Sequence, residues 1–213
     1  MLVSKPIRFT VAIDGPAAAG KGTVAKGLAD HFGFSHLDTG LLYRAIAVKA
    51  LVGEDPITAA NELVASDMTS QTLQSPKVAR MASKVAVIPQ VRAALLAFQK
   101  NFASQDGGAV LDGRDIGTII CPEAQIKIFI TASAEIRAKR RYDELQSKGL
   151  ETSYDKVLRD VKERDERDMT RKDAPLKPAH DAHILDTSGL SIMASLQKAI
   201  DITSTAFVKA MKI

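Results

Sequence analysis

One short segment near the N-terminus limits what this chain can fold into. A β-branched and apolar run, Phe9 to Ile13, ends at Asp14 and passes into a glycine-rich loop that opens an amphipathic stretch. Backbone N–H groups of such a loop converge on an oligophosphate, the next helix N-terminus adds a positive dipole end, and the lysine reaches the outer phosphates. We therefore expect a phosphate-binding loop made of Gly15, Pro16, Ala17, Ala18, Ala19, Gly20, Lys21, Gly22 and Thr23.

The spacing of this loop departs by one place from the strict phosphate-loop pattern. Gly15, Gly20 and Lys21 fit G-x-x-x-x-G-K, but Gly22 follows the lysine and the hydroxyl arrives only at Thr23. An ordinary turn and helix start is the alternative interpretation. The preceding strand and the following helix favour phosphate binding, with Lys21 as an exposed cation of the loop.

The composition is that of an ordinary globular protein. The 213 residues are 46% hydrophobic and 25% charged, with a net charge of +4, which suits one domain with small appendages and an anionic ligand. The absence of tryptophan and of a lysine-rich tail argues against a nucleic-acid interface. Because Cys121 has no partner for a disulfide and no long apolar run occurs, we expect a cytoplasmic protein without a membrane partner. We also expect a monomer.

Short apolar runs alternate with amphipathic stretches along the chain, which predicts an α/β fold with a mostly parallel sheet covered by helices on both faces. Predicted strands are Phe9–Asp14, Ser35–Asp38, Ala109–Asp112, Ile126–Thr131 and His183–Asp186. Predicted helices are Thr23–Phe32, Leu41–Val52, Pro89–Phe102, Ala134–Lys148, Tyr154–Arg171 and Ser191–Met211. Two further segments, Gly53 to about Ile88 and around Gln146 to Asp155, look peripheral and are interpreted either as small mobile subdomains or as ordinary surface loops.

Two groups of acids, hydroxyls and arginines follow predicted strands, at the edge where parallel sheets bind ligands. One runs from Asp38 to Arg44 and the other from Asp112 to Thr118. Each alone is also consistent with a glycine turn capped by aspartate.

Arginines recur on single helical faces. Arg137 and Arg141 are four residues apart, and Arg164, Asp168 and Arg171 share one face of the next predicted helix. Solvated salt-bridge faces are the ordinary interpretation, but phosphoryl transfer also needs planar guanidinium donors.

Taken together and in this order, the loop, Asp38-Thr39-Gly40 with Tyr43-Arg44, Asp112-Gly113-Arg114-Asp115, and Glu163-Arg164-Asp165 with Arg167-Asp168 and Arg171 resemble the bacterial cytidylate kinases, across nearly the whole chain. The extra glycine after the lysine is typical of nucleoside monophosphate kinases. The resemblance implies a three-layer P-loop kinase fold with a five-stranded sheet in one domain over residues 1–213. It also implies a monophosphate-binding insert near 53–90 and a lid near 142–157.

The resemblance implies transfer of the γ-phosphoryl group of ATP to CMP or dCMP, with Mg²⁺. Lys21 and the loop would hold the ATP phosphates, and Thr23 would lie near the metal, directly or through water. By similarity Arg44, Arg114 and Arg171 would bind the monophosphate, Ser83, Arg92 and Asp115 the cytosine, and Arg164 and Asp168 the ribose. Thr39 and Tyr43 belong to the same substrate site, and the catalytic set is Lys21, Arg114, Arg137, Arg141 and Arg171, of which Arg137 and Arg141 border the lid.

Two features depart from that family pattern. Ala17 and Ala18 stand where members commonly have Ser-Gly, which predicts an altered affinity for ATP. The segment between Val52 and Pro76 is short, which predicts an insert that lacks part of its small sheet.

Two other functions stay open at this point. One is a small P-loop kinase with a different acceptor, such as another nucleoside monophosphate or a shikimate-like molecule. The other is a nucleotide-binding regulatory or nucleic-acid-binding protein without catalysis.

Overall fold

The computed structural model describes residues 8–69 and 71–210 and contains one five-stranded sheet. Its order is β2-β3-β1-β4-β5, and all four neighbouring pairs are parallel. The predicted strands are confirmed as β1(Thr10–Asp14), β2(Ser35–Asp38), β3(Ala109–Gly113), β4(Ile126–Thr131) and β5(His183–Asp186).

The six predicted helices are also present, with ends that shift by at most two residues. They are α1(Lys21–Phe32), α2(Thr39–Leu51), α5(Pro89–Ala103), α6(Ala134–Ser147), α7(Tyr154–Thr170) and α8(Ile192–Ala210). The final residue of the last predicted helix, Met211, lies outside the described residues. A π-helical turn, η3(Ile116–Ile120), follows β3 and was not predicted.

Residues 53–88 form helices rather than an ordinary loop. They contain α3(Pro56–Asn61), the 3-10 turns η1(Ala65–Thr69) and η2(Gln71–Gln74), and α4(Pro76–Val85). Asp55 and Ser75 start the two helices because their side chains accept hydrogen bonds from the first backbone N–H groups. The described residues of this α3–α4 segment contain no strand.

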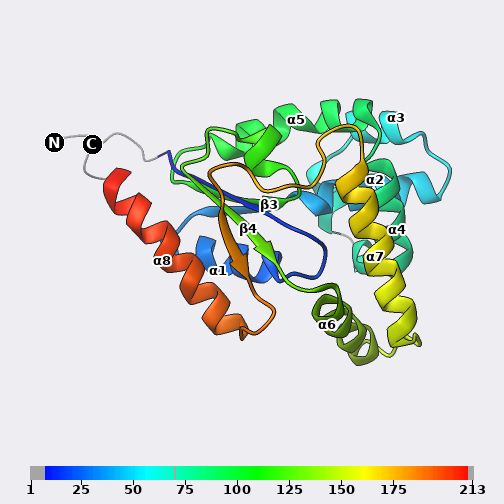
Figure 1. Ribbon diagram of the computed structural model, residues 1–213. Helices are drawn as coiled ribbons and strands as arrows, with labels where there is room; N and C mark the ends of the chain where they lie inside the picture. Colours follow the sequence, from blue (N-terminus) through cyan, green and yellow to red (C-terminus); the bar gives the residue numbers. More distant parts are fainter. Residues whose placement is uncertain (1–7, 70, 211–213) are drawn as a thin grey trace.

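The two faces of the sheet have separate cores because strand side chains alternate. Val11 and Ile13 of β1 pack toward the core that also holds Val24 and Leu28 of α1, together with side chains of α8. Ala12 packs on the other side, toward Leu96 of α5. Helices therefore cover both faces and complete three layers (Figure 1).

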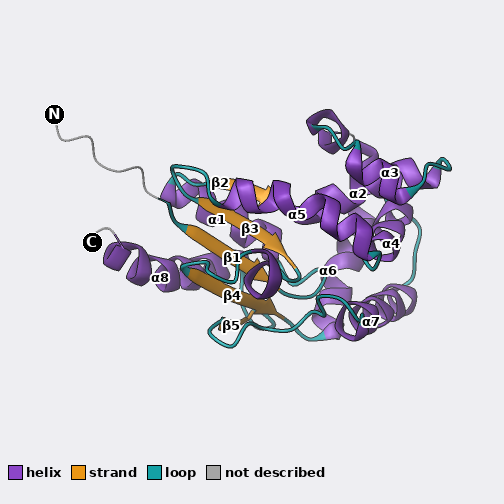
Figure 2. Cartoon of the chain, turned by 90° about the horizontal axis from the view of Figure 1, so that it is seen from above, coloured by secondary structure: helices purple, strands orange, loops and turns teal. Residues whose placement is uncertain are grey.

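The remaining helices lie beyond the carboxyl ends of the strands. Figure 2 places α2 and α4 on one side of this region, and α6 and α7, joined by residues 148–153, on the other. The α6–α7 hairpin has a small apolar core of its own, which includes Ala138, Leu145 and Val161. No single helix in the described ranges is long and apolar enough to cross a membrane, although α4 and α5, bent by 98°, meet that requirement as a pair.

The loop after β1 has two backbone positions with positive φ that matter for its shape. Gly15 has a φ of +146°, and a Cβ there would lie 1.9 Å from the carbonyl oxygen of Ile130. Only glycine lets the loop leave β1 this close to β4. Ala18 has a φ of +59°, a region that costs an alanine on the order of 1 kcal/mol.

We predict that Gly15→Ala lowers the free energy of unfolding by about 3 kcal/mol, because a clash with backbone adds to the strain of a positive φ. Thermal or urea unfolding measures the loss. Gly22→Ala is the matched control, since Gly22 has open space around its Cβ position and should lose no stability. Equal stability of the two variants would contradict the assigned close approach.

Candidate functional site

A cleft of about 810 Å³ opens beyond the carboxyl ends of the strands, between the phosphate-binding loop, α4 and the α6–α7 hairpin. It brings together most of the residues predicted from the sequence. Those that line it are Ala17, Ala18, Lys21, Gly22, Thr23, Thr39, Tyr43, Arg44, Ser83, Arg114, Asp115, Arg141, Arg164 and Asp168. The predicted residues that do not line it are Gly15, Pro16, Ala19, Gly20, Arg92, Arg137 and Arg171.

The loop is held from behind by side chains of other elements. Thr187 Oγ1 donates to the carbonyl oxygen of Ala19 at 3.0 Å, and Arg137 Nη1 donates to that of Ala17 at 3.3 Å. Gly20 precedes α1 with a φ of +93° and no side-chain cap, so the first N–H groups of the helix are left for another acceptor. This is the arrangement that binds anions at a helix N-terminus.

Lys21 lies at the floor of the cleft and is buried, so the expectation of an exposed loop cation was wrong. Its side chain is 6% exposed, and Nζ donates to the carbonyl oxygen of Pro16 at 2.8 Å. Burial, with a further contribution from Arg114, lowers the pKa of Lys21 to about 7. A buried ammonium in this position needs a negatively charged partner.

Several arginines line the cleft together with Lys21 and with acidic side chains such as Asp38. Burial lowers the pKa of Arg44, with contributions from Arg141 and Arg114, and it lowers the pKa of Arg164 to about 10. Lys21, Arg44, Arg114, Arg141 and Arg164 are called the cationic cluster below.

One buried donor of the cationic cluster has only a long ion-pair contact among the described residues. Arg164 Nε is buried and makes no hydrogen bond, and the carboxylate of Asp168 lies 3.8 Å away. That carboxylate instead accepts from Arg114 Nε at 2.9 Å. Although burial opposes it, Arg114 and Arg164 hold the pKa of Asp168 below its ordinary value. An orphaned guanidinium donor beside a cleft indicates an anion that is absent from this structure.

Asp115 is the centre of a second group of side chains. It is 4% exposed and accepts hydrogen bonds from Arg92 and, at 3.5 Å, from Arg171 Nη2. Arg92 also donates to the hydroxyl of Tyr43 at 3.3 Å. The structure therefore brings the predicted pair Arg92 and Asp115 together, with Arg171 behind them.

Ser83 reaches the cleft from the α3–α4 segment and meets a residue that was not predicted. Its Oγ accepts a hydrogen bond from Arg167 Nη1 of α7 at 2.9 Å. The sequence places Arg167 three residues after Arg164, on a neighbouring part of the same helical face, and this spacing was the available signal.

The carboxyl end of β1 is joined to the segment after β3 through Asp14. Its two carboxylate oxygens accept from the backbone N–H groups of Ile116 at 2.7 Å and Gly117 at 2.8 Å. Burial outweighs these hydrogen bonds and raises the pKa of Asp14 to about 6. Asp14 thereby fixes the start of η3, and with it Asp115, relative to the loop.

The first turn of α2 is fixed in the same way. Asp38 caps the helix by accepting from the N–H of Gly40 at 2.8 Å. Thr39 Oγ1 donates to the carbonyl oxygen of Asp112 at 2.8 Å, so this predicted substrate-binding hydroxyl already has a partner.

The two predicted lid arginines differ in their surroundings. Arg137 is buried and forms a bidentate ion pair with Asp165 at 2.9 and 2.6 Å, which ties α6 to α7. Arg141 lines the cleft and donates to Glu144 at 2.6 Å. A catalytic role for either residue stays a prediction.

The residues present fit a magnesium ion that arrives with its phosphate ligand. Thr23 is exposed in the first turn of α1, where its hydroxyl lines the cleft. Within the described ranges, no three His, Cys, Asp or Glu side chains gather into a metal site. Mg²⁺ that is bound mainly by phosphates and waters needs no such cage.

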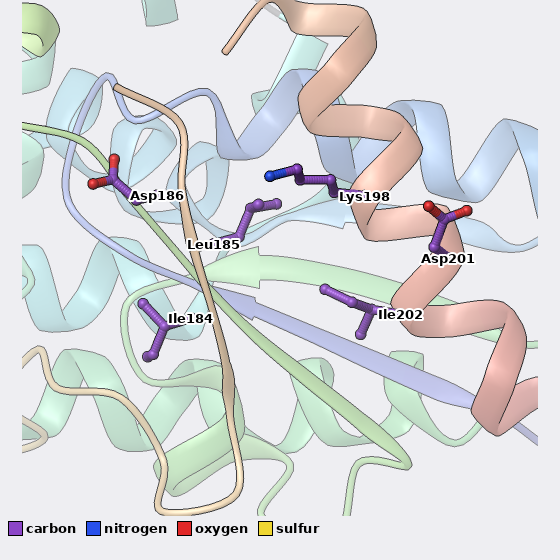
Figure 3. Close-up of a pocket in the computed structure, with 6 residues that line it drawn as sticks. All are labelled: Ile184, Leu185, Asp186, Lys198, Asp201 and Ile202. Carbon is purple, nitrogen blue, oxygen red and sulfur yellow. The ribbon is translucent and has the colours of Figure 1, made fainter. Parts of the chain in front are cut away.

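A second hollow of about 470 Å³ lies on the outer side of β5, against α8 (Figure 3). Its lining is Ile184, Leu185, Asp186, Lys198, Asp201 and Ile202, and it contains none of the predicted site residues. The chemistry therefore belongs to the larger cleft.

The chain was compared with known proteins. The family model described as cytidylate kinase matches residues 11–205. The chain is 57% identical over 195 residues to a cytidylate kinase of Cereibacter sphaeroides strain KD131, covering 92% of this chain and 95% of that protein. It is 50% identical over 207 residues to a cytidylate kinase of Agrobacterium fabrum, covering 93% and 98%.

Solved structures resemble the fold at low sequence identity. An uncharacterized protein from Eubacterium ventriosum matches with a TM-score of 0.58 and 17% identity, covering 93% of this chain and 99% of that one. A gluconokinase from Sinorhizobium meliloti matches with a TM-score of 0.51 and 13% identity, covering 98% and 99%. These likenesses support the α/β architecture.

We predict that the protein takes up a proton when a nucleoside triphosphate binds in this cleft at pH 8. Lys21 is mostly neutral there in the free protein because its pKa is lowered to about 7, and bound phosphate raises that pKa. The effect should vanish near pH 6, where Lys21 is already protonated. Calorimetry of ATP binding in buffers of different ionisation enthalpy measures the uptake. Lys21→Met is the control, and equal uptake by this variant would contradict the assignment.

Proposed function

The chain belongs to the cytidylate kinase family, and from this premise we propose how the residues of its cleft divide the work of phosphorylating CMP. It is a phosphotransferase that uses ATP. We propose dCMP as a second acceptor, the α3–α4 segment as the monophosphate-binding insert, and the α6–α7 hairpin as the lid.

One observation supports this division most directly. The cationic cluster places Lys21 of the phosphate-binding loop opposite arginines from α2, the β3 end, α6 and α7. Burial lowers the pKa of Lys21, Arg44 and Arg164, and neighbouring cations add to this lowering. Two phosphate-bearing ligands that meet in the cleft would neutralise the charge of these cations, which is what transfer between two nucleotides requires.

On the donor side, Lys21 and the backbone N–H groups of the loop from Ala17 to Thr23 hold the phosphates of ATP. Mg²⁺ bound with ATP, near Thr23, supplies charge neutralisation for the phosphoryl group that is transferred. Because Ala18 keeps its backbone N–H, the loop retains the donor at the position where relatives commonly have glycine.

On the acceptor side, Arg44, Arg114 and Arg171 hold the phosphate of CMP. Arg164 and Asp168 bind the ribose hydroxyls, with the orphaned Nε of Arg164 as an available donor. Asp115 accepts from the exocyclic amino group of cytosine, since a carboxylate only accepts and this group donates.

The reaction needs no general base. The attacking atom is an ionised phosphate oxygen of CMP, so positioning in line and charge neutralisation lower the barrier. Arg114 lies between the two sides, because it pairs with Asp168 and lowers the pKa of Lys21. Closure of the hairpin with Arg137 and Arg141 excludes water and prevents hydrolysis of ATP.

An assay of ADP release with each nucleoside monophosphate, under ATP and Mg²⁺, tests this function. CMP and dCMP should be turned over fastest, and Lys21→Met should lower kcat by at least about a hundredfold because a charge contact in the transition state is lost. Turnover of AMP or of a non-nucleotide acceptor in place of CMP would refute the proposal. Near-normal kcat for Lys21→Met would refute the role of Lys21.

Asp115→Asn separates base recognition from ATP binding. The amide keeps the size of the side chain but weakens an acceptor that faces the cytosine amino group, so kcat/KM for CMP should fall by about a hundredfold. KM for ATP should change by less than about twofold. Equal losses toward ATP and CMP in Asp115→Asn would remove Asp115 from base recognition.

A further inference from the structure

Arg167 and Ser83 meet across the cleft in a contact to which the proposed function gives no role. Arg167 comes from α7 and Ser83 from α4, and Arg167 Nη1 donates to Ser83 Oγ at 2.9 Å. Both residues line the cleft, and Ser83 is 4% exposed. A buried serine whose hydroxyl meets a cation is restricted in what else it can bind.

The restriction follows from the chemistry of the two groups. A guanidinium has donors only, so the hydroxyl oxygen of Ser83 must act as the acceptor in this contact. The hydroxyl hydrogen is then directed elsewhere, and no other described residue accepts it through a hydrogen bond found in the structure. An O–H group that accepts from a cation is also a stronger donor. Ser83 therefore presents a polarised donor to the cleft.

Asp115 presents a hydrogen-bond acceptor in the same cleft. Its carboxylate is held by Arg92 and Arg171 and only accepts. An acceptor and a donor in one pocket match cytosine, whose amino group donates and whose adjacent ring nitrogen accepts. Uracil has a carbonyl and an N–H at these positions. Its carbonyl would face the acceptor Asp115, and its N–H would face the donor Ser83.

We propose that Arg167 is a specificity-determining positioning residue, which fixes the Ser83 hydroxyl as a hydrogen-bond donor to the ring edge of the pyrimidine and so favours CMP over UMP. The inference rests on the proposed function, because it takes the base to lie between Ser83 and Asp115. It goes beyond that function in assigning Arg167, which acts through Ser83 and does not touch the reacting atoms.

The alternative role for this contact is mechanical. Lys148 Nζ of the hairpin donates to Gln74 Oε1 of the α3–α4 segment at 3.2 Å, and Arg80 of α4 forms an ion pair with Asp160 of α7 at 3.9 Å. The contact between Arg167 and Ser83 is therefore one of several bridges between the same parts. A purely mechanical bridge would change the turnover of every acceptor alike. The ratio of kcat/KM for CMP to that for UMP separates the two roles.

The test measures this ratio for the full chain and four variants. Arg167→Met and Ser83→Ala should each lower it by about tenfold, the effect of one charge-assisted hydrogen bond. The double variant should lower it no further than either alone, because both remove the same donor. Arg167→Lys should restore most of the ratio. KM for ATP should stay within about twofold throughout.

Lys148→Met is the matched control, because it removes another bridge between the same parts and should leave the ratio unchanged. An unchanged ratio in Ser83→Ala, which leaves Arg167 in place, or additive losses in the double variant would overturn the inference. So would equal losses toward CMP and UMP in Arg167→Met. Wild-type protein without CMP turnover would instead overturn the proposed function on which the inference rests.

Discussion

The buried carboxylate of Asp14 is the interaction on which the geometry of the site depends. It ends the central strand and accepts from Ile116 and Gly117, so the phosphate-binding loop and the segment that carries Arg114 and Asp115 start from one rigid point. The arrangement is costly, as burial raises the pKa of Asp14 to about 6. The sides of the cleft proposed for ATP and for CMP are therefore positioned by the sheet and not by flexible loops.

Much of the fold followed from the sequence because its signals were local. Apolar runs such as Phe9–Asp14 end in acids, and the amphipathic stretches between the runs left parallel crossovers as the simplest arrangement. The helices of residues 53–88 were missed, since proline at positions 56 and 76 reads as a break. In the structure each proline begins a helix, after Asp55 and Ser75.

The sequence predicted most residues of the candidate site but not the contacts between them. The positions of Lys21 and Arg114 after predicted strands placed them near one sheet edge, and the family resemblance placed Asp168 in the same site. The contact between Arg167 and Ser83 joins residues 84 positions apart, and no local pattern carries such a pairing. The burial of Lys21 was misjudged for a related reason, because its surroundings come from β3 and α7 as well as from its own loop.

The positive φ of Ala18 has a consequence for how this protein meets its nucleotide. Glycine usually occupies a backbone position with positive φ. It gives the unfolded chain more conformational entropy and leaves the folded loop more flexible. With alanine, the free-energy cost of the unfavourable conformation lowers the stability of the fold and does not have to be met when the ligand binds. The loop therefore has its binding conformation before the nucleotide binds, and binding loses less conformational entropy. The methyl group of Ala18 preorganises the loop in this way.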